Sequence, residues 1–247
     1  MRSGFGILAI AAMLCFGSAA GAGPLVKLPA DPAKAAGLRT TKAGSMDMLS
    51  APVAIEAPGR TGVFGLNGRQ YRISQPTQAE VVHVQAGQNT WVDKGGKAHP
   101  VTKGDVLFFA ARRPNTARDA AGYVDHYVLF PATGEAADKT PDAMPLNPAE
   151  VDASRFAAAA GGREHVYLAT DEGSRVVAWR ADDQGSVSNS PDFRYLAVTA
   201  GRAVFTEGGA STEVAAGDTL LIPAGSSYSW RGQGLVGVLV SMKPKAN

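Results

Sequence analysis

The sequence predicts an all-β protein built from two tandem barrel domains, and three observations support this. Short apolar runs alternate with turn residues, and the composition is rich in glycine, proline, valine and alanine, which is typical of strands joined by tight turns. A strand–turn–strand pattern occurs twice, at residues 104–115 and 217–230. The copies run in step, with an offset of 114 positions between Gly87 and Gly201 and of 113 between Gly104 and Gly217. This offset indicates an internal duplication.

The second copy carries the clearest local signals. Gly217 and Asp218 form a turn dipeptide, the segment Thr219–Ile222 reads as a short strand, and Pro223 begins a second turn. Together they predict a strand, a corner and a further strand that contains Tyr228 and Trp230.

On these residues the chain resembles the cupin superfamily, whose members are jelly-roll barrels, and specifically its two-barrel members. Gly217, Asp218, Pro223 and Gly225 fit the second cupin motif, and Glu80 and Gly87 fit the later half of the first. The resemblance implies two tandem cupin-like jelly-roll barrels, and the residues between them predict a linker with one short helix.

The resemblance also implies a metal site of about three histidines and a glutamate, and here the sequence departs from the family. The histidine pair of the first motif would fall near residues 73–76, which read Ile-Ser-Gln-Pro, and the later histidine near Asn115. In the second copy Arg194 replaces the glutamate and Tyr228 the histidine. We therefore expect no metal and no other cofactor in either barrel.

The N-terminus predicts export. Residues 1–22 contain an early Arg2, a short apolar run and a small-x-small pattern that ends at Ala22, which is typical of a cleaved signal peptide. The apolar run is shorter than the roughly 20 residues that span a bilayer, so we expect no membrane span. The only cysteine, Cys15, lies within this segment. The expected location is periplasmic or secreted.

The remaining chain divides by composition into four parts. An N-terminal arm is expected over residues 23–52, a first barrel over 53–131, a linker with a helix over 132–162 and a second barrel over 163–247. The helix is expected at Ala149–Ala160, because Asn147 and Pro148 form a favourable helix start and two glycines follow.

Net charge limits the class of partner. Lysine and arginine exceed aspartate and glutamate by 2 over the whole chain, without a dense basic run, which argues against nucleic acid. We expect a small-molecule ligand as the partner, either a carboxylate or a sugar. The sequence leaves a homo-oligomer open.

Two sets of candidate site residues follow. In the first barrel, Glu80 can act as a buried general base, and His126 is the histidine that can reach it; the alternative is a charge at the start of a strand. In the second barrel, Arg194, Tyr228 and Trp230 are expected to line one pocket for an organic acid, unless the aromatic residues only fill the barrel and Arg194 is exposed.

Two functions therefore remain open. The first is an exported, metal-free, two-barrel protein that binds a small polar or anionic ligand without catalysis. The alternative is an isomerase, lyase or hydrolase of small acids or sugars that uses Glu80 and His126. The fold does not choose between them, because cupins include enzymes as well as binding and storage proteins.

Overall fold

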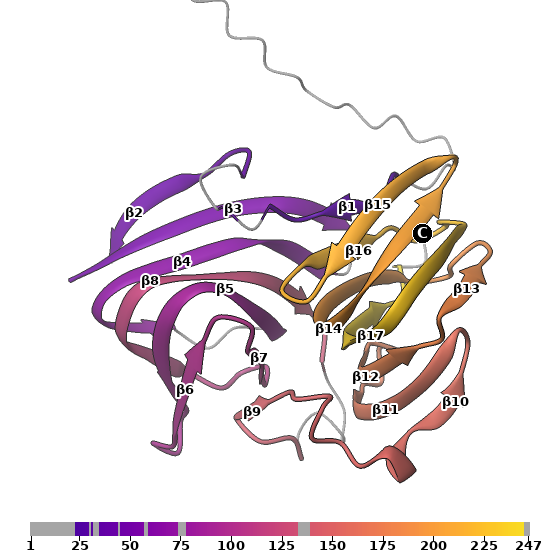
Figure 1. Cartoon of the computed structure of the whole chain (residues 1–247). Coiled ribbons are helices and arrows are strands. Elements are labelled where there is room, and N and C mark those ends of the chain that lie inside the picture. The colour runs from indigo at the N-terminus through magenta and orange to yellow at the C-terminus, as the bar shows by residue number, and fades with distance from the viewer. Residues whose placement is uncertain are drawn as a thin grey trace, which may run out of the picture.

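The structure is a computed structural model that describes residues 23–29, 31, 35–43, 45–56, 59–73, 78–132 and 139–244 (Figure 1). The expected signal peptide at residues 1–22 lies outside the described residues. Among the described residues, no helix is long and apolar enough to cross a membrane.

The first barrel is one antiparallel sheet in the order β2-β3-β4-β8-β5-β7-β9, with β6 paired to β5. Its strands are β2 (Arg39–Ala43), β3 (Met46–Glu56), β4 (Gly59–Ile73), β5 (Ala79–Val92), β6 (Ala98–Thr102), β7 (Val106–Phe109), β8 (Asn115–Phe130) and β9 (Ala143–Pro145).

The second barrel is a sheet in the order β1-β16-β14-β17-β12-β11-β10, with β13 paired to β17 and β15 to β14. Its strands are β1 (Val26–Lys27), β10 (Ala157–Ala159), β11 (Gly162–Ala169), β12 (Arg175–Ala181), β13 (Gln184–Val187), β14 (Phe193–Glu207), β15 (Ala210–Ala215), β16 (Thr219–Ile222) and β17 (Tyr228–Met242).

The two sheets repeat the same connectivity, which confirms the predicted tandem architecture. The order β3-β4-β8-β5-β7 in the first barrel matches β11-β12-β17-β14-β16 in the second. Gly87 and Gly201 occupy equivalent bulges at positive φ, 66° and 72°. A Cβ on Gly87 would lie 2.3 Å from the backbone of Gly122, and one on Gly201 would lie 2.1 Å from the carbonyl oxygen of Gly234. Both bulges therefore require glycine.

The two barrels pack against each other through a shared apolar core. Val81, Phe108 and Phe130 of the first barrel belong to the same buried cluster as Tyr195 and Val240 of the second. The hydroxyl group of Tyr195 donates a hydrogen bond across this contact to the carbonyl oxygen of His126, at 2.9 Å. Because each strand alternates its faces, the residues between these contacts point into the interior of their own barrel.

Short segments from elsewhere in the chain complete both sheets. Strand β9, from the linker, pairs with β7 of the first barrel. Strand β1, from the N-terminal arm, pairs with β16 of the second barrel, with Val26 opposite Leu221. The arm then continues to the first barrel, where Pro29 accepts a hydrogen bond from His126.

The helix predicted at Ala149–Ala160 is wrong. Asn147 does begin a turn, because its side chain accepts a hydrogen bond from the backbone N–H of Ala149. The chain then forms only a 3₁₀ turn, η2 (Ala153–Arg155), followed by strand β10. Phe156 explains the difference, because it is buried against Val151 and Ala178, and the Arg180 guanidinium lies 4.0 Å from the centre of its ring. Tertiary packing overrides the helix propensity of the alanines.

Candidate functional site

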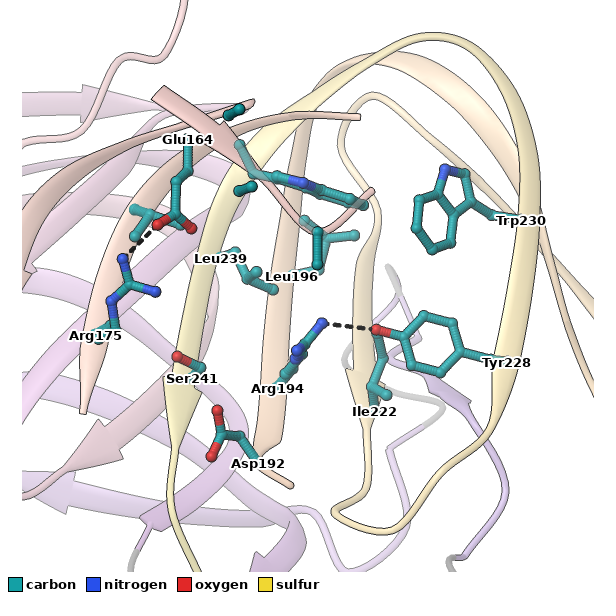
Figure 2. A pocket seen from close by; sticks show the side chains of 15 residues that line it. Glu164, Arg175, Asp192, Arg194, Leu196, Ile222, Tyr228, Trp230, Leu239 and Ser241 are labelled. Atoms are coloured by element: carbon teal, nitrogen blue, oxygen red, sulfur yellow. Dashed lines mark hydrogen bonds and ion pairs between the residues drawn. The ribbon is translucent and has the colours of Figure 1, made fainter. Parts of the chain in front are cut away.

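The three residues predicted for the second barrel meet inside it (Figure 2). Arg194 comes from β14, and Tyr228 and Trp230 lie at alternate positions of β17, with the exposed Ser229 between them. The Arg194 Nη1 donates a hydrogen bond to the hydroxyl oxygen of Tyr228 at 2.9 Å. The guanidinium therefore points into the barrel, as the sequence predicts.

Aromatic side chains form one wall of this interior. Trp230 packs edge-on against Trp179, with ring centres 5.6 Å apart, and stacks on Phe205 at 6.1 Å. Its indole Nε1 donates a hydrogen bond to the carbonyl oxygen of Asp182 at 3.1 Å. Gly185 lies against the ring, since a Cβ there would come within 2.2 Å of it. The position of the indole is thus fixed from several sides.

These residues enclose a cavity of about 260 Å³. It is lined by both apolar and charged side chains: Ala158, Ala159, Ala160, Glu164, Arg175, Val177, Trp179, Asp192, Arg194, Leu196, Ile222, Tyr228, Trp230, Leu239 and Ser241. The volume is below the range of about 300–1,000 Å³ that is typical of sites for drug-sized molecules. The cavity therefore suits a smaller ligand.

Hydrogen-bonding groups at the lower end of the cavity in Figure 2 remain unused. Among the described residues, the buried Nε of Arg194 and Oδ1 of Asp192 have no hydrogen-bond partner. Arg175, by contrast, forms an ion pair with Glu164. Unpaired buried polar atoms are costly, so Arg194 and Asp192 mark the part of the cavity where a polar ligand gains most.

Tyr228 remains a neutral phenol in this site. Burial raises the pKa of its hydroxyl group, and the nearby Arg194 offsets only part of that effect. Because the hydroxyl oxygen accepts the hydrogen bond from Arg194, its own proton is free to be donated to a ligand. Arg194 and Tyr228 together present donors for an anionic oxygen.

The first barrel does not bring Glu80 and His126 together. In the register of β5 and β8, Glu80 is opposite Leu129, whereas His126 is opposite His83. Strand alternation puts Glu80 on the interior face and His126 on the face that meets the second barrel. There the Nε2 of His126 lies 3.0 Å from the carbonyl oxygen of Pro29. The expectation that His126 reaches Glu80 is wrong for this reason.

Glu80 itself is a half-buried carboxyl group whose pKa is raised by burial to about 7. Sequence reasoning missed its neighbour Asp125, which is buried, and whose pKa is raised well above its usual value by burial and by Glu80. It also missed Asp192. An available signal for Asp125 was its place in the apolar strand Tyr123–Phe130, at an alternate position to Tyr123.

The described side chains of the two barrels do not form the metal set of a cupin. No group of three or more histidine, cysteine, aspartate or glutamate side chains in the described part of the chain is arranged to hold a metal ion. At the two equivalent positions of the second barrel, Arg194 and Tyr228 supply a cation and a neutral phenol. The prediction that neither barrel binds a metal stays a prediction.

Comparisons with family models and with curated proteins find no match. Solved structures do match. Protein Ylba from E. coli superposes with a TM-score of 0.60 at 13% identity, over 92% of this chain and 93% of that chain. A cupin 2 conserved barrel domain protein from Leptotrichia buccalis gives 0.59 at 11% identity, over 84% and 92%.

Streptomyces albus HEPD, solved with 2-hydroxyethylphosphonate and Fe(II), gives a TM-score of 0.56 at 10% identity, over 90% of this chain and 77% of that chain. At these identities the likeness concerns the fold alone.

Proposed function

For a chain that has the two-barrel fold of the cupin superfamily, we propose a binding role in which the second barrel holds a small hydroxy acid without transforming it. The observation that carries this proposal is the Arg194 guanidinium, which faces the cavity with an unpartnered Nε. A guanidinium can bind a carboxylate through two parallel hydrogen bonds, and few other small groups match that geometry.

The neighbouring groups define the rest of the ligand. The Tyr228 hydroxyl supplies a further donor for the carboxylate, and the Oδ1 of Asp192 can accept a hydrogen bond from a ligand hydroxyl group. The apolar side of the cavity, at Trp179 and Trp230, accommodates a short carbon chain. A hydroxy acid or sugar acid satisfies all three requirements.

The same groups favour binding over catalysis. Arginine does not exchange its proton in proteins, and the raised pKa of Tyr228 keeps the phenol protonated. Neither group is therefore suited to act as a general base near neutral pH. Together with the expected signal peptide at residues 1–22, this supports an exported binding protein.

Calorimetric titration with lactate, glycerate and gluconate tests the proposal, with lactamide as the uncharged control. Replacing Arg194 by alanine should weaken carboxylate binding about tenfold or more, because hydrogen bonds to a charged group contribute about 1.5–3 kcal/mol. Arg118→Ala is the matched control, since Arg118 is exposed on the first barrel.

Equal binding of the acids by wild type and Arg194→Ala would disprove the role of the cavity, and so would the absence of any carboxylate binding. NMR spectra of the acids after long incubation with the protein should be unchanged. A new product that forms with wild type and not with Arg194→Ala would identify an enzyme instead.

A further inference from the structure

The interior of the first barrel contains two carboxyl groups, those of Glu80 and Asp125. Asp125 is only 1% exposed, and among the described residues no donor meets full hydrogen-bond geometry with either of its carboxyl oxygens, although the nearby Tyr123 hydroxyl group partly offsets the rise in its pKa. Among the residues that the structure describes, no lysine, arginine or histidine forms an ion pair with Asp125 or Glu80. A buried carboxylate without a partner is unfavourable, so this interior either keeps protons or accepts a cation.

Strand alternation places both carboxyl groups on the inner face. Val82 and Val84, two and four positions after Glu80, belong to the core of the first barrel. Asp125 is directly opposite Val84, and Tyr127 is opposite Val82. Glu80 and Asp125 therefore face the same interior, four positions apart along their strands, and Glu80 raises the pKa of Asp125.

Exposure differs along this inner face. Glu80, Tyr127 and Leu129 are partly exposed, although all three lie on the inner face of their strands. Deeper in the barrel, Asp125 and Tyr123 are buried, at 1% exposure each. Glu80 thus lies at the more exposed end of this face, and Asp125 lies deeper.

The walls beside Asp125 are aromatic. Trp91 packs against Phe109, with ring centres 5.1 Å apart, and against Tyr123 at 6.0 Å. The indole Nε1 of Trp91 donates to the Tyr123 hydroxyl oxygen at 3.4 Å. Aromatic rings attract ammonium groups, and the low polarity around them strengthens a contact between opposite charges.

We propose that the first barrel binds a small organic amine, whose ammonium group lies between Asp125 and Glu80. The equivalent strand position differs in charge between the barrels, because the first barrel has Glu80 where the second has Arg194. The proposal does not depend on the anion site.

Binding of the ammonium group is coupled to proton release. Burial raises the pKa of Asp125 well above its usual value and that of Glu80 to about 7, so both groups lose their protons at a higher pH than exposed carboxyl groups do. The other ionisable groups near this interior are the phenols of Tyr123 and Tyr127, whose pKa values are raised by burial, and Arg60, which acts on Tyr127. The affinity for an amine should therefore rise with pH until the amine itself loses its proton.

Butylamine is the probe, with butan-1-ol and butyrate as matched controls for shape and charge. Saturation-transfer NMR and thermal unfolding of the wild-type protein should show binding of butylamine that is stronger at pH 8 than at pH 6. Butan-1-ol should bind about tenfold more weakly or not at all, since it lacks the charge.

Two isosteric variants locate the site. Asp125→Asn and Glu80→Gln should each remove most of the butylamine response, whereas Arg194→Ala should keep it. Glu80→Gln also serves as an independent variant if Asp125→Asn does not fold. An equal response to butan-1-ol, no response of the wild-type protein to butylamine, or an unchanged response in both isosteric variants would each overturn the proposal.

Discussion

The contact between the barrels should weaken in acid because of two neutral histidines. His83 and His126 are cross-strand neighbours on the face that meets the second barrel, and both are buried. The Nδ1 of His83 lies 3.0 Å from the Thr219 hydroxyl oxygen of the second barrel. Burial lowers the pKa of His83 to about 3, with a further decrease from His126, and burial lowers that of His126 to about 4.

The direction of the effect follows from these shifts. Each folded-state pKa lies below the ordinary value of 6.5, so the unfolded chain binds the proton more tightly between pH 6.5 and about 4. The stabilisation that these neutral histidines contribute is therefore fully present above about pH 6.5. The free energy of unfolding falls as the pH decreases through this window. For His126 alone, the loss between pH 7.5 and pH 4.5 is about 2.5 kcal/mol, at 1.36 kcal/mol per pKa unit.

Urea denaturation of wild type and His126→Gln at these two pH values measures this loss. Apart from His83, whose pKa His126 lowers, the titrating groups near this contact are shared by both proteins, so wild type should lose about 2.5 kcal/mol more than the variant on acidification. Thr219→Val is the control, because it removes the contact of His83 with the second barrel without removing a titratable group. It should lower stability by about 1 kcal/mol at pH 7.5 while retaining a steep pH dependence. Parallel pH profiles for wild type and His126→Gln would refute the reasoning.

Three further predictions concern other parts of the chain. Glu80→Gln should stabilise the protein at pH 8 by up to about 3 kcal/mol and have little effect at pH 4, because the raised folded-state pKa of Glu80 means that its ionised form destabilises the fold. Denaturation at both pH values measures this, and a loss of stability at pH 8 would contradict it. Gly185→Ala should lower the free energy of unfolding by about 1–3 kcal/mol and weaken carboxylate binding, because the added methyl group displaces Trp230. Melting temperatures and calorimetric titration measure the two effects. A variant identical to wild type would show that the indole is not confined. Intact-mass measurement of exported protein should find the chain to begin after Ala22, and a retained Met1 would exclude cleavage.

The repeated architecture could be predicted because it depends on local signals that occur twice. Strand β16 has the same bounds, Thr219–Ile222, in the sequence analysis and in the structure. Arg194 and Tyr228 could be predicted to lie together because strand alternation and the alignment of the two repeats both placed their side chains on the inner face of the second barrel. These inferences require only the two-residue alternation of side chains along a strand and the residue preferences of turns.

Contacts between distant segments could not be predicted in the same way. The alanine run after Phe156 has high helix propensity, and only the packing of that phenylalanine against Ala178 shows why a strand forms. Glu80 and His126 were paired by residue type, although the register of their strands separates them. Asp192 was overlooked because its role depends on where β14 begins relative to the cavity, which is a tertiary property.

The N-terminal arm pairs with the second barrel although it precedes the first barrel in the sequence, so the second barrel is incomplete as an isolated fragment. Strand β1 covers the edge of β16, and the backbone N–H of Leu28 donates to the carbonyl oxygen of Thr219 at 2.9 Å. A fragment that begins at the second barrel would therefore expose an apolar strand edge, and such edges recruit other chains. A further consequence concerns synthesis: the arm is made well before its partner strand β16, so the second sheet cannot be completed until that strand has also been made.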